Sequence, residues 1–242
     1  EAKRKPVVAL LASCSYMLSK IIRELRAEGV PFHNPYRTKN GAWNPYRGGI
    51  DRYRAFLSPA FAEPFRLWTW GEMRRWADMV RSDGVFQLGA KVMIDTLGKD
   101  KERSGQALTR DEGLSLFTRE AWDALGKAYV DTRARREWLG AACLPSKLKL
   151  LDYAFNVSRI RGDRALFEDP KVIVGTIHSV KGAQADNVFL SPELSESGYS
   201  EWLTEGDPRD GIRRQFYVGM TRARERLALC APSQYATVDW NE

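Results

Sequence analysis

The chain has 242 residues, of which 43% are hydrophobic and 29% charged, with 19 glycines and 11 prolines. This is the composition of a folded globular protein, which excludes collagen-like, low-complexity and wholly disordered classes. Three cysteines without CxxC spacing and two histidines argue against a disulfide framework and predict no metal site. The cysteine usage fits a reducing cytosol, so we expect a cytoplasmic protein. No apolar run reaches the roughly 18 residues that a membrane span needs, so we expect no membrane partner.

Positive charge is unevenly distributed along the chain, whose net charge is +7. Residues 1–165 contain 30 Lys and Arg against 19 Asp and Glu, whereas residues 166–242 contain 8 against 12. A basic region with interleaved aromatic residues fits a polyanion such as nucleic acid, because neutralised phosphates release counterions. A solvated, arginine-rich surface is the alternative that composition leaves open.

The first elements are typical of an α/β sheet. Pro6–Leu11 is a short apolar run that predicts a buried strand, and Val30–Phe32 predicts an extended segment. Between them, apolar residues from Leu18 to Leu25 recur at helical spacing. Residues 34–49 are rich in Asn, Pro, Gly and aromatic side chains, which predicts a long loop.

Residues from about 50 to 165 have helical periodicity and almost no strand signal. We predict helices over Gly71–Ser82, Phe86–Leu97, Thr118–Leu139 and Ser146–Ile160. Most tryptophans of this region are predicted to lie in its core, and stacking on nucleobases is the alternative for some of them.

The α/β pattern resumes after residue 165. Strands are predicted at Lys171–Gly175, Asn187–Leu190 and Leu227–Cys230. Ser191–Asp210 predicts an acidic loop, and a helix is expected from Asp210 to about Arg224. We therefore predict one α/β domain, residues 1–34 and 166–242, interrupted by a mostly helical insertion, residues 35–165.

The segment GTIHSVKGAQAD, residues 175–186, directly follows a predicted buried strand. Open α/β sheets bind ligands beyond the carboxyl ends of their strands. Four of its side chains could contact phosphate oxygens there: Thr176, His178, Ser179 and Lys181. Gly182 would let the backbone approach a ligand closely. A turn whose Thr, Ser and Asp residues only cap helices is an equally open alternative.

The segment RRQFYVGMTRARER, residues 213–226, places Gln215, Val218 and Arg222 on one face of the predicted helix. An arginine in a mostly uncharged stretch suits bidentate contact with a phosphate, including one that is being transferred. A salt bridge to an acidic loop is the alternative for Arg222. We assign Arg224 and Arg226 to a solvent-exposed face.

Together, TIHSVKGAQAD and RRQFYVGMTRA closely resemble motifs V and VI of superfamily 1 DNA helicases of the UvrD/Rep/PcrA type. The resemblance covers residues 6–34 and about 165–232, and it extends to the insertion only by position and helical character. It implies a RecA-like parallel-sheet domain (the second such domain, 2A, of a helicase), related to P-loop NTPases but without the P-loop. It also implies that the helical region is a 2B-like insertion.

The resemblance implies roles for individual residues. Arg222 corresponds to the catalytic arginine that reaches the γ-phosphate of ATP. Gln184 takes the place of a glutamate that contacts the ribose, and Gly182 belongs to the same ATP-binding motif. Thr176, His178 and Lys181 match positions that hold the DNA single strand or couple it to the nucleotide.

Two features depart from the family pattern. The family follows its first strand with a Tyr-Arg pair, where this chain has Ala12-Ser13, so the second arginine is missing or displaced. The chain contains no GxxxxGK[ST] sequence, and Asp111-Glu112 does not follow an apolar strand. We therefore expect ATP and Mg²⁺ as cofactors of a full-length protein, and we expect this chain alone to bind neither and to hydrolyse no ATP.

The function that the resemblance implies is that of the C-terminal part of an ATP-dependent DNA helicase or translocase with 3′→5′ polarity. Its partners would be single-stranded and duplex DNA, at the nucleoid, and N-terminal ATPase domains (1A and 1B) on the same or another chain. The alternative is a non-catalytic nucleic-acid-binding or regulatory module that keeps the fold, which Ala12-Ser13 and Gln184 favour slightly. A nuclease would need a carboxylate cluster with metal spacing, and none is evident.

Overall fold

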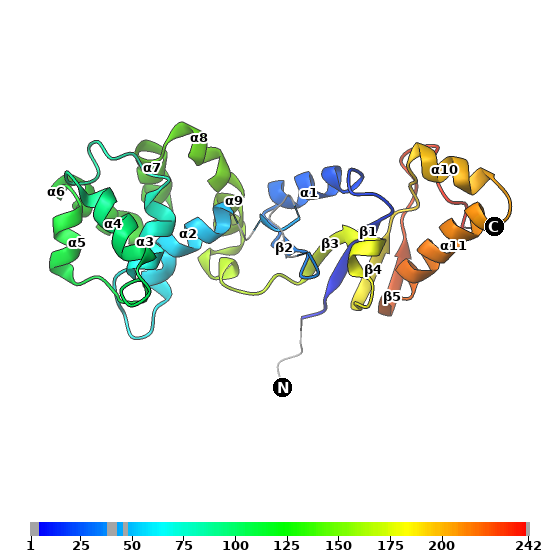
Figure 1. Cartoon of the computed structure of the whole chain (residues 1–242), viewed down its shortest axis with the longest axis horizontal. Helices are drawn as coiled ribbons and strands as arrows, with labels where there is room; N and C mark the ends of the chain where they lie inside the picture. The colour runs from blue at the N-terminus through cyan, green and yellow to red at the C-terminus, as the bar shows by residue number, and fades with distance from the viewer. Residues whose placement is uncertain (1–4, 38–42, 46–47, 241–242) are drawn as a thin grey trace. The chain divides into compact units, whose positions relative to one another are not determined.

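The computed structural model describes residues 5–37, 43–45 and 48–240. The chain divides into two compact units: unit 1 comprises Glu1–Pro45 and Glu168–Glu242, and unit 2 comprises Tyr46–Phe167 (Figure 1). Unit 1 extends beyond the predicted boundary at residue 34 because Asn44 contacts Asn34. The Oδ1 atom of Asn44 accepts a hydrogen bond from the Asn34 backbone N–H at 2.7 Å.

Unit 1 is built on a five-stranded sheet in which every pair of neighbouring strands is parallel. The strand order is β2-β3-β1-β4-β5. The strands are β1 (Val8–Ala12), β2 (Phe32–His33), β3 (Val172–Thr176), β4 (Ala185–Leu190) and β5 (Ala223–Leu229). The predicted α/β class with a parallel sheet is therefore confirmed.

Strand β1 occupies the centre of the sheet, since it pairs with β3 on one side and β4 on the other. A central parallel strand is covered on both faces, which explains its near-continuous apolar sequence. On one face Leu11 packs in a core with Leu190 and Phe216. Ala12 and Val174 point to the other face by alternation and have 0% exposure.

The helices of unit 1 are α1 (Leu18–Ala27), η5 (Ile177–Val180, a 3-10 helix), α10 (Glu196–Leu203) and α11 (Asp207–Met220). In Figure 1, α1 lies beside β1, β2 and β3, and α11 lies beside β4 and β5. Helix α10 corrects the expected loop at Ser191–Asp210: Ser195 begins this helix, its Oγ accepting from the Gly198 N–H at 3.1 Å.

In the residues of unit 2 that the structure describes, the regular elements are helices. They are α2 (Gly49–Leu57), η2 (Ser58–Phe61), α3 (Trp70–Ala77), α4 (Ala90–Lys99), α5 (Arg110–Leu116), α6 (Arg119–Val130), α7 (Thr132–Ala142), α8 (Pro145–Leu148), η3 (Lys149–Leu151), α9 (Asp152–Arg161) and η4 (Asp163–Leu166). The single helix predicted over Thr118–Leu139 is wrong. Asp131 breaks it and caps α7, its Oδ1 accepting from the Ala134 N–H at 2.7 Å.

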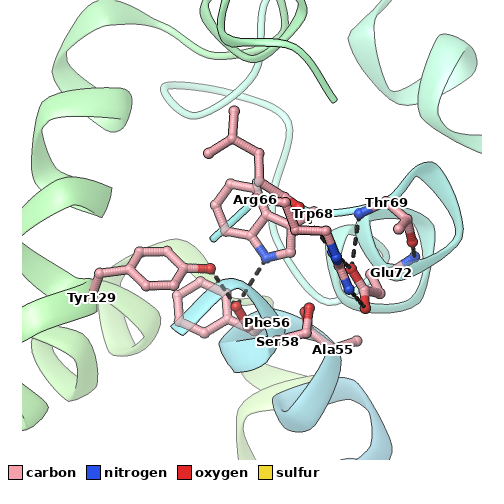
Figure 2. A network of polar contacts seen from close by, with 9 residues as sticks. Ala55, Phe56, Ser58, Arg66, Trp68, Thr69, Glu72 and Tyr129 are labelled. Atoms are coloured by element: carbon pink, nitrogen blue, oxygen red, sulfur yellow. Dashed lines mark hydrogen bonds and ion pairs between the residues drawn. The ribbon is translucent and has the colours of Figure 1, made fainter. Parts of the chain in front are cut away.

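Buried aromatic side chains form the core of unit 2. Trp68, Trp70 and Trp76 have exposures of 0–2%, so these three are core residues rather than stacking platforms. The Phe56 carbonyl oxygen accepts hydrogen bonds from both Trp68 Nε1, at 2.9 Å, and the Tyr129 hydroxyl (Figure 2). One backbone oxygen thus satisfies two buried aromatic donors at the end of α2.

A network of charged and polar side chains lies at the N-terminus of helix α3, in the same part of unit 2. Thr69 and Glu72 form a reciprocal capping box, and Arg66 makes a bidentate ion pair with Glu72 at 2.6 and 2.8 Å (Figure 2). These hydrogen bonds hold the pKa of Glu72 below its ordinary value although burial opposes that shift. Glu72 therefore stays ionised at neutral pH and completes the helix N-terminus.

Among the ion pairs of the described part of unit 2, Arg135 of α7 is the most deeply buried partner, with 3% side-chain exposure. Its guanidinium donates to Asp163 Oδ2 at 2.6 Å and to the backbone carbonyl oxygens of Ala128 and Tyr129 at 3.0 and 3.2 Å. This one side chain therefore joins α6, α7 and the segment after α9.

None of the helices in the described ranges is long and apolar enough to cross a lipid bilayer. Within the same ranges, no three His, Cys, Asp or Glu side chains lie close enough together to hold a metal ion.

We predict that Arg135→Met destabilises unit 2 by about 3–5 kcal/mol, because it removes the cation from the Asp163 carboxylate, which keeps a hydrogen bond only from the Ser158 hydroxyl among the described residues, and removes a donor from two carbonyl groups. The matched control is Arg133→Met on the same helix. Arg133 is 89% exposed and pairs with the exposed Glu137, so we expect no measurable change. Urea unfolding followed by tryptophan fluorescence measures both, and equal midpoints for the two variants would contradict the structural role of Arg135.

Candidate functional site

The parallel sheet separates the predicted site residues into two groups. Strand β3 ends at Thr176, at the carboxyl edge of the sheet, and β4 begins at Ala185, at the amino edge. Because β1 lies between β3 and β4, the connecting residues 177–184 cross β1 to return to the amino edge. A strand of five or six residues spans about 17–20 Å, so the two groups lie at opposite ends of the strands.

The first group, which we call the carboxyl-edge cluster, consists of residues Ser13, Asn34, Thr176, His178, Ser179 and Gln215. Gln215 of α11 links two of its segments. Its Nε2 lies 3.5 Å from the Ser13 carbonyl oxygen and 3.4 Å from His178 Nδ1. The structure thus brings the segments after β1 and β3 together with helix α11, although the sequence separates Gln215 from Ser13 by 202 positions.

Thr176 and Ser179 bond to each other's backbone. Thr176 Oγ1 accepts from the Ser179 N–H at 3.2 Å, and Ser179 Oγ donates to the Thr176 carbonyl oxygen at 2.8 Å. Thr176 is buried, and its hydroxyl caps the N-terminus of η5. This is the capping role that the sequence left open as the alternative. His178 is exposed on the next turn of the chain, and a contact of His178 or Thr176 with DNA remains a prediction.

Asn34 is a member of the cluster that sequence reasoning missed. It is 1% exposed, and its Nδ2 donates to the Val174 carbonyl oxygen at 3.0 Å and to Ser179 Oγ at 3.1 Å. Gly175 makes room for this contact, since a Cβ there would lie 2.5 Å from Ser179 Oγ and 2.6 Å from Asn34 Nδ2. The only sequence signal was an Asn two positions after the predicted extended segment Val30–Phe32, and the structure shows that Asn34 directly follows β2.

The second group, which we call the amino-edge cluster, consists of Gly182, Gln184, Asp186, Arg222 and Arg224. The backbone joins its two segments, because the Ala185 N–H donates to the Arg222 carbonyl oxygen at 2.9 Å. Gly182 has a φ of 85°, a left-handed conformation that favours glycine, and it turns the chain toward β4. Lys181, just before this turn, is exposed.

Arg222 does not lie on helix α11, which corrects the predicted common face with Gln215 and Val218. The helix ends at Met220 rather than near Arg224, and β5 begins at Ala223. Arg222 occupies the connecting turn, because β5 must start at the amino edge to pair in parallel with β4.

The half-buried Arg222 guanidinium is held by three oxygen atoms. Nε donates to the Val218 carbonyl at 2.9 Å, Nη1 to the Ala183 carbonyl at 3.1 Å, and Nη2 to Thr221 Oγ1 at 3.0 Å. Over the described part of the chain, no carboxylate forms an ion pair with Arg222, so the salt-bridge alternative is not observed. Its positive charge is therefore positioned but not neutralised.

Gln184 contacts an arginine from the neighbouring strand. Arg224 Nε donates to Gln184 Oε1 at 3.0 Å, and Arg224 Nη1 lies 3.9 Å from Asp186 Oδ1. Arg224 and Arg226 are exposed, as the sequence predicted. Asp186, for which the sequence offered a helix cap as the alternative, lies instead in strand β4. It is 3% exposed and accepts from the Val7 N–H at 2.7 Å, tying the start of β1 to β4.

The other histidine and the cysteines lie outside both clusters. Burial lowers the pKa of His33, at the end of β2, so this imidazole is neutral at physiological pH. Burial also raises the pKa of Cys230 and raises that of Cys143 to about 11. These two thiols therefore stay protonated and are poor nucleophiles.

Comparison with known protein families identifies one part of the chain. Residues 156–234 match the sequence model of the UvrD-like helicase C-terminal domain. These residues, which include β3, β4, α11 and β5, are therefore similar to a UvrD-type helicase C-terminal region. No curated protein matches the chain.

We predict that Gly175→Ala destabilises unit 1 by about 1–3 kcal/mol, because its Cβ would push apart Ser179 and Asn34. Gly211→Ala in helix α11 is the control. A Cβ at Gly211 meets no atom within 4 Å, so this variant should be neutral or stabilising by less than about 1 kcal/mol. Denaturant unfolding of both variants decides, and a Gly175→Ala protein as stable as the control would show that the cluster repacks freely.

Proposed function

We propose that unit 1 belongs to an ATP-dependent DNA helicase or translocase, to which it contributes an arginine for the nucleotide and part of the single-strand track. The observation that carries the proposal is the state of Arg222. A guanidinium has five N–H donors, and the three hydrogen bonds of Arg222 leave two donors for a ligand. A positioned, unneutralised arginine suits a phosphate whose negative charge develops during transfer.

The amino-edge cluster fits a nucleotide in its donor chemistry. Arg222 would reach the γ-phosphate and Gln184 the ribose, and Gly182 would allow the backbone to approach closely. The bound ATP would supply the phosphoanhydride bond that is cleaved. We assign the phosphate loop and the Mg²⁺ ligands to the partner ATPase domains 1A and 1B, on the same or another chain.

The carboxyl-edge cluster, together with Lys181 at the end of η5, would contact the DNA single strand. His178 and Lys181 are exposed and carry hydrogen-bond donors, which suit phosphate and base oxygens. The buried Thr176 would hold the turn that presents them. Movement along the strand in the 3′→5′ direction is part of this proposal and rests on the resemblance of the two motifs.

A second candidate function is a nucleic-acid-binding or regulatory module without ATP coupling. Ala12 is 0% exposed, and the Ser13 hydroxyl donates to the Glu193 carbonyl oxygen at 2.6 Å. Neither side chain can supply a cation where the resembling helicases have a second arginine. Nucleotide hydrolysis with a single arginine would distinguish the first candidate from this one.

In a protein that joins this chain to its phosphate-loop domains, we predict that Arg222→Ala lowers ATP turnover by about 10³–10⁵-fold. Affinity for single-stranded DNA should change little, because Arg222 belongs to the amino-edge cluster. Arg226→Ala, an exposed arginine of β5, is the matched control and should keep wild-type turnover. Equal turnover of Arg222→Ala and wild type would make Arg222 a structural residue, and absent turnover in the wild type would favour the second candidate.

Unit 2 is proposed to contact duplex DNA, as the positive charge of the insertion suggests. Several of its arginines pair with acidic residues of other segments of unit 2, which reduces the charge available to phosphates. These pairs are Arg52–Asp78, Arg74–Asp95, Arg75–Asp51, Arg103–Glu112 and Arg135–Asp163. Contact of these arginines with phosphates would cost an ion pair, as it would for Arg66, Lys99 and Arg133, which pair with Glu72, Asp95 and Glu137.

We predict that the chain binds forked DNA without sequence preference, with a dissociation constant on the order of 10⁻⁴–10⁻⁶ M at physiological salt. Because phosphate contacts release counterions, affinity should fall steeply as salt rises. Fluorescence anisotropy of a labelled fork at several salt concentrations measures the slope. An affinity that is indifferent to salt, or no binding at low salt, would assign unit 2 to protein contacts or to a structural role.

A further inference from the structure

We infer that Gln215 is a positioning residue for His178: its side-chain amide holds the imidazole in the tautomer protonated at Nε2, which sets His178 to donate a hydrogen bond to an oxygen acceptor of the bound strand. The identity of the ligand rests on the proposed function, whereas the tautomer does not. Gln215 belongs to the second motif and His178 to the first, so this contact is a direct physical link between them.

The orientation of the Gln215 amide follows from the chemistry of its neighbours. The Ser13 carbonyl oxygen can only accept a hydrogen bond, so the part of the amide that faces it at 3.5 Å is the NH₂ group. An NH₂ group has two hydrogens. The second is available to His178 Nδ1, which lies 3.4 Å from the same nitrogen.

The orientation of the amide then determines the tautomer of the imidazole. A ring nitrogen that accepts a hydrogen bond carries no proton, so Nδ1 is the acceptor and the neutral ring is protonated at Nε2. His178 is exposed, and no described residue forms a hydrogen bond with its Nε2. The Nε2–H group is therefore a free donor at the carboxyl edge of the sheet.

Close packing keeps the two side chains at this distance. A Cβ on Gly219 of α11 would lie 3.2 Å from Ile177, the residue before His178, so helix α11 and η5 approach closely. Ile177 and Phe216, the neighbours of His178 and Gln215 in the chain, are 1% and 2% exposed. The backbones that carry the amide and the imidazole are therefore anchored in the core.

The presence of only two histidines makes the tautomer directly measurable. In the 242-residue chain labelled with ¹⁵N-histidine, at about pH 8.5 where an ordinary imidazole is neutral, the ¹⁵N chemical shifts separate protonated from unprotonated ring nitrogens. His178→Gln removes one set of signals and thereby assigns the other to His33. We expect the wild-type His178 to show an unprotonated Nδ1 and a protonated Nε2.

Two variants test whether Gln215 is the cause. Gln215→Glu offers His178 only acceptors, so the proton is expected to move to Nδ1. Gln215→Leu removes the contact at similar volume, and both shifts should move toward the averaged values of free histidine. Tyr217→Phe is the control, because Tyr217 lies on the same helix with 68% exposure and should leave the His178 signals unchanged. A protonated Nδ1 in the wild type, or wild-type shifts in both Gln215 variants, would overturn the inference.

The ligand is tested separately by the binding of a fluorescent oligothymidylate. Loss of one hydrogen bond to a charged phosphate corresponds to about tenfold weaker binding, and we expect this for His178→Gln and Gln215→Glu but not for Tyr217→Phe. If the tautomer is as inferred and neither variant weakens binding, the assignment of the strand as ligand is wrong while the positioning by Gln215 stands. If the wild-type tautomer is reversed, the positioning role is wrong whatever the affinity.

Discussion

Parallel pairing of the central strand β1 with both β3 and β4 is the constraint on which the site depends. Because β3 and β4 run in the same direction on either side of β1, residues 177–184 cross from the carboxyl edge to the amino edge. The first motif therefore has one end at each edge of the sheet. Parallel pairing of β5 with β4 imposes the same requirement on the second motif, which descends along α11 and turns at Arg222.

Backbone carbonyl oxygens hold the side chains at both edges. Carbonyl groups of Val218 and Ala183 orient the Arg222 guanidinium, and the Ser13 carbonyl orients the Gln215 amide. Carbonyl groups accept but do not donate, so each contact uses one donor and leaves the net charge of the side chain unchanged. An arginine held in this way keeps its full charge for a phosphate, unlike one that is paired with a carboxylate.

Arginine has two different functions in unit 2. Arg135 and Arg66 form ion pairs with carboxylates and donate hydrogen bonds to carbonyl oxygens, and their role is to join segments around the aromatic core. Others are exposed, and only these can contribute to an electrostatic contact with DNA. An arginine and the carboxylate that it pairs with add nothing to the net charge, so the +7 of the whole chain already leaves these pairs out. The number of Lys and Arg residues, 38, is what overstates the cations that a polyanion can meet.

Sequence by itself determined the features that depend on neighbouring residues: the apolar runs of β1, β3 and β4, the helical character of unit 2, and two motifs that lie within the part of the chain that is similar to the UvrD-like helicase C-terminal domain. It also predicted the exposed positions of Arg224 and Arg226. Only the tertiary structure decided that Arg222 leaves helix α11, that Asn34 contacts Ser179, and that Gln215 joins His178 to Ser13. The physical reason is that helical periodicity and burial are local properties, whereas these contacts join segments up to 202 positions apart and exist only because the parallel sheet brings the ends of its strands to common edges.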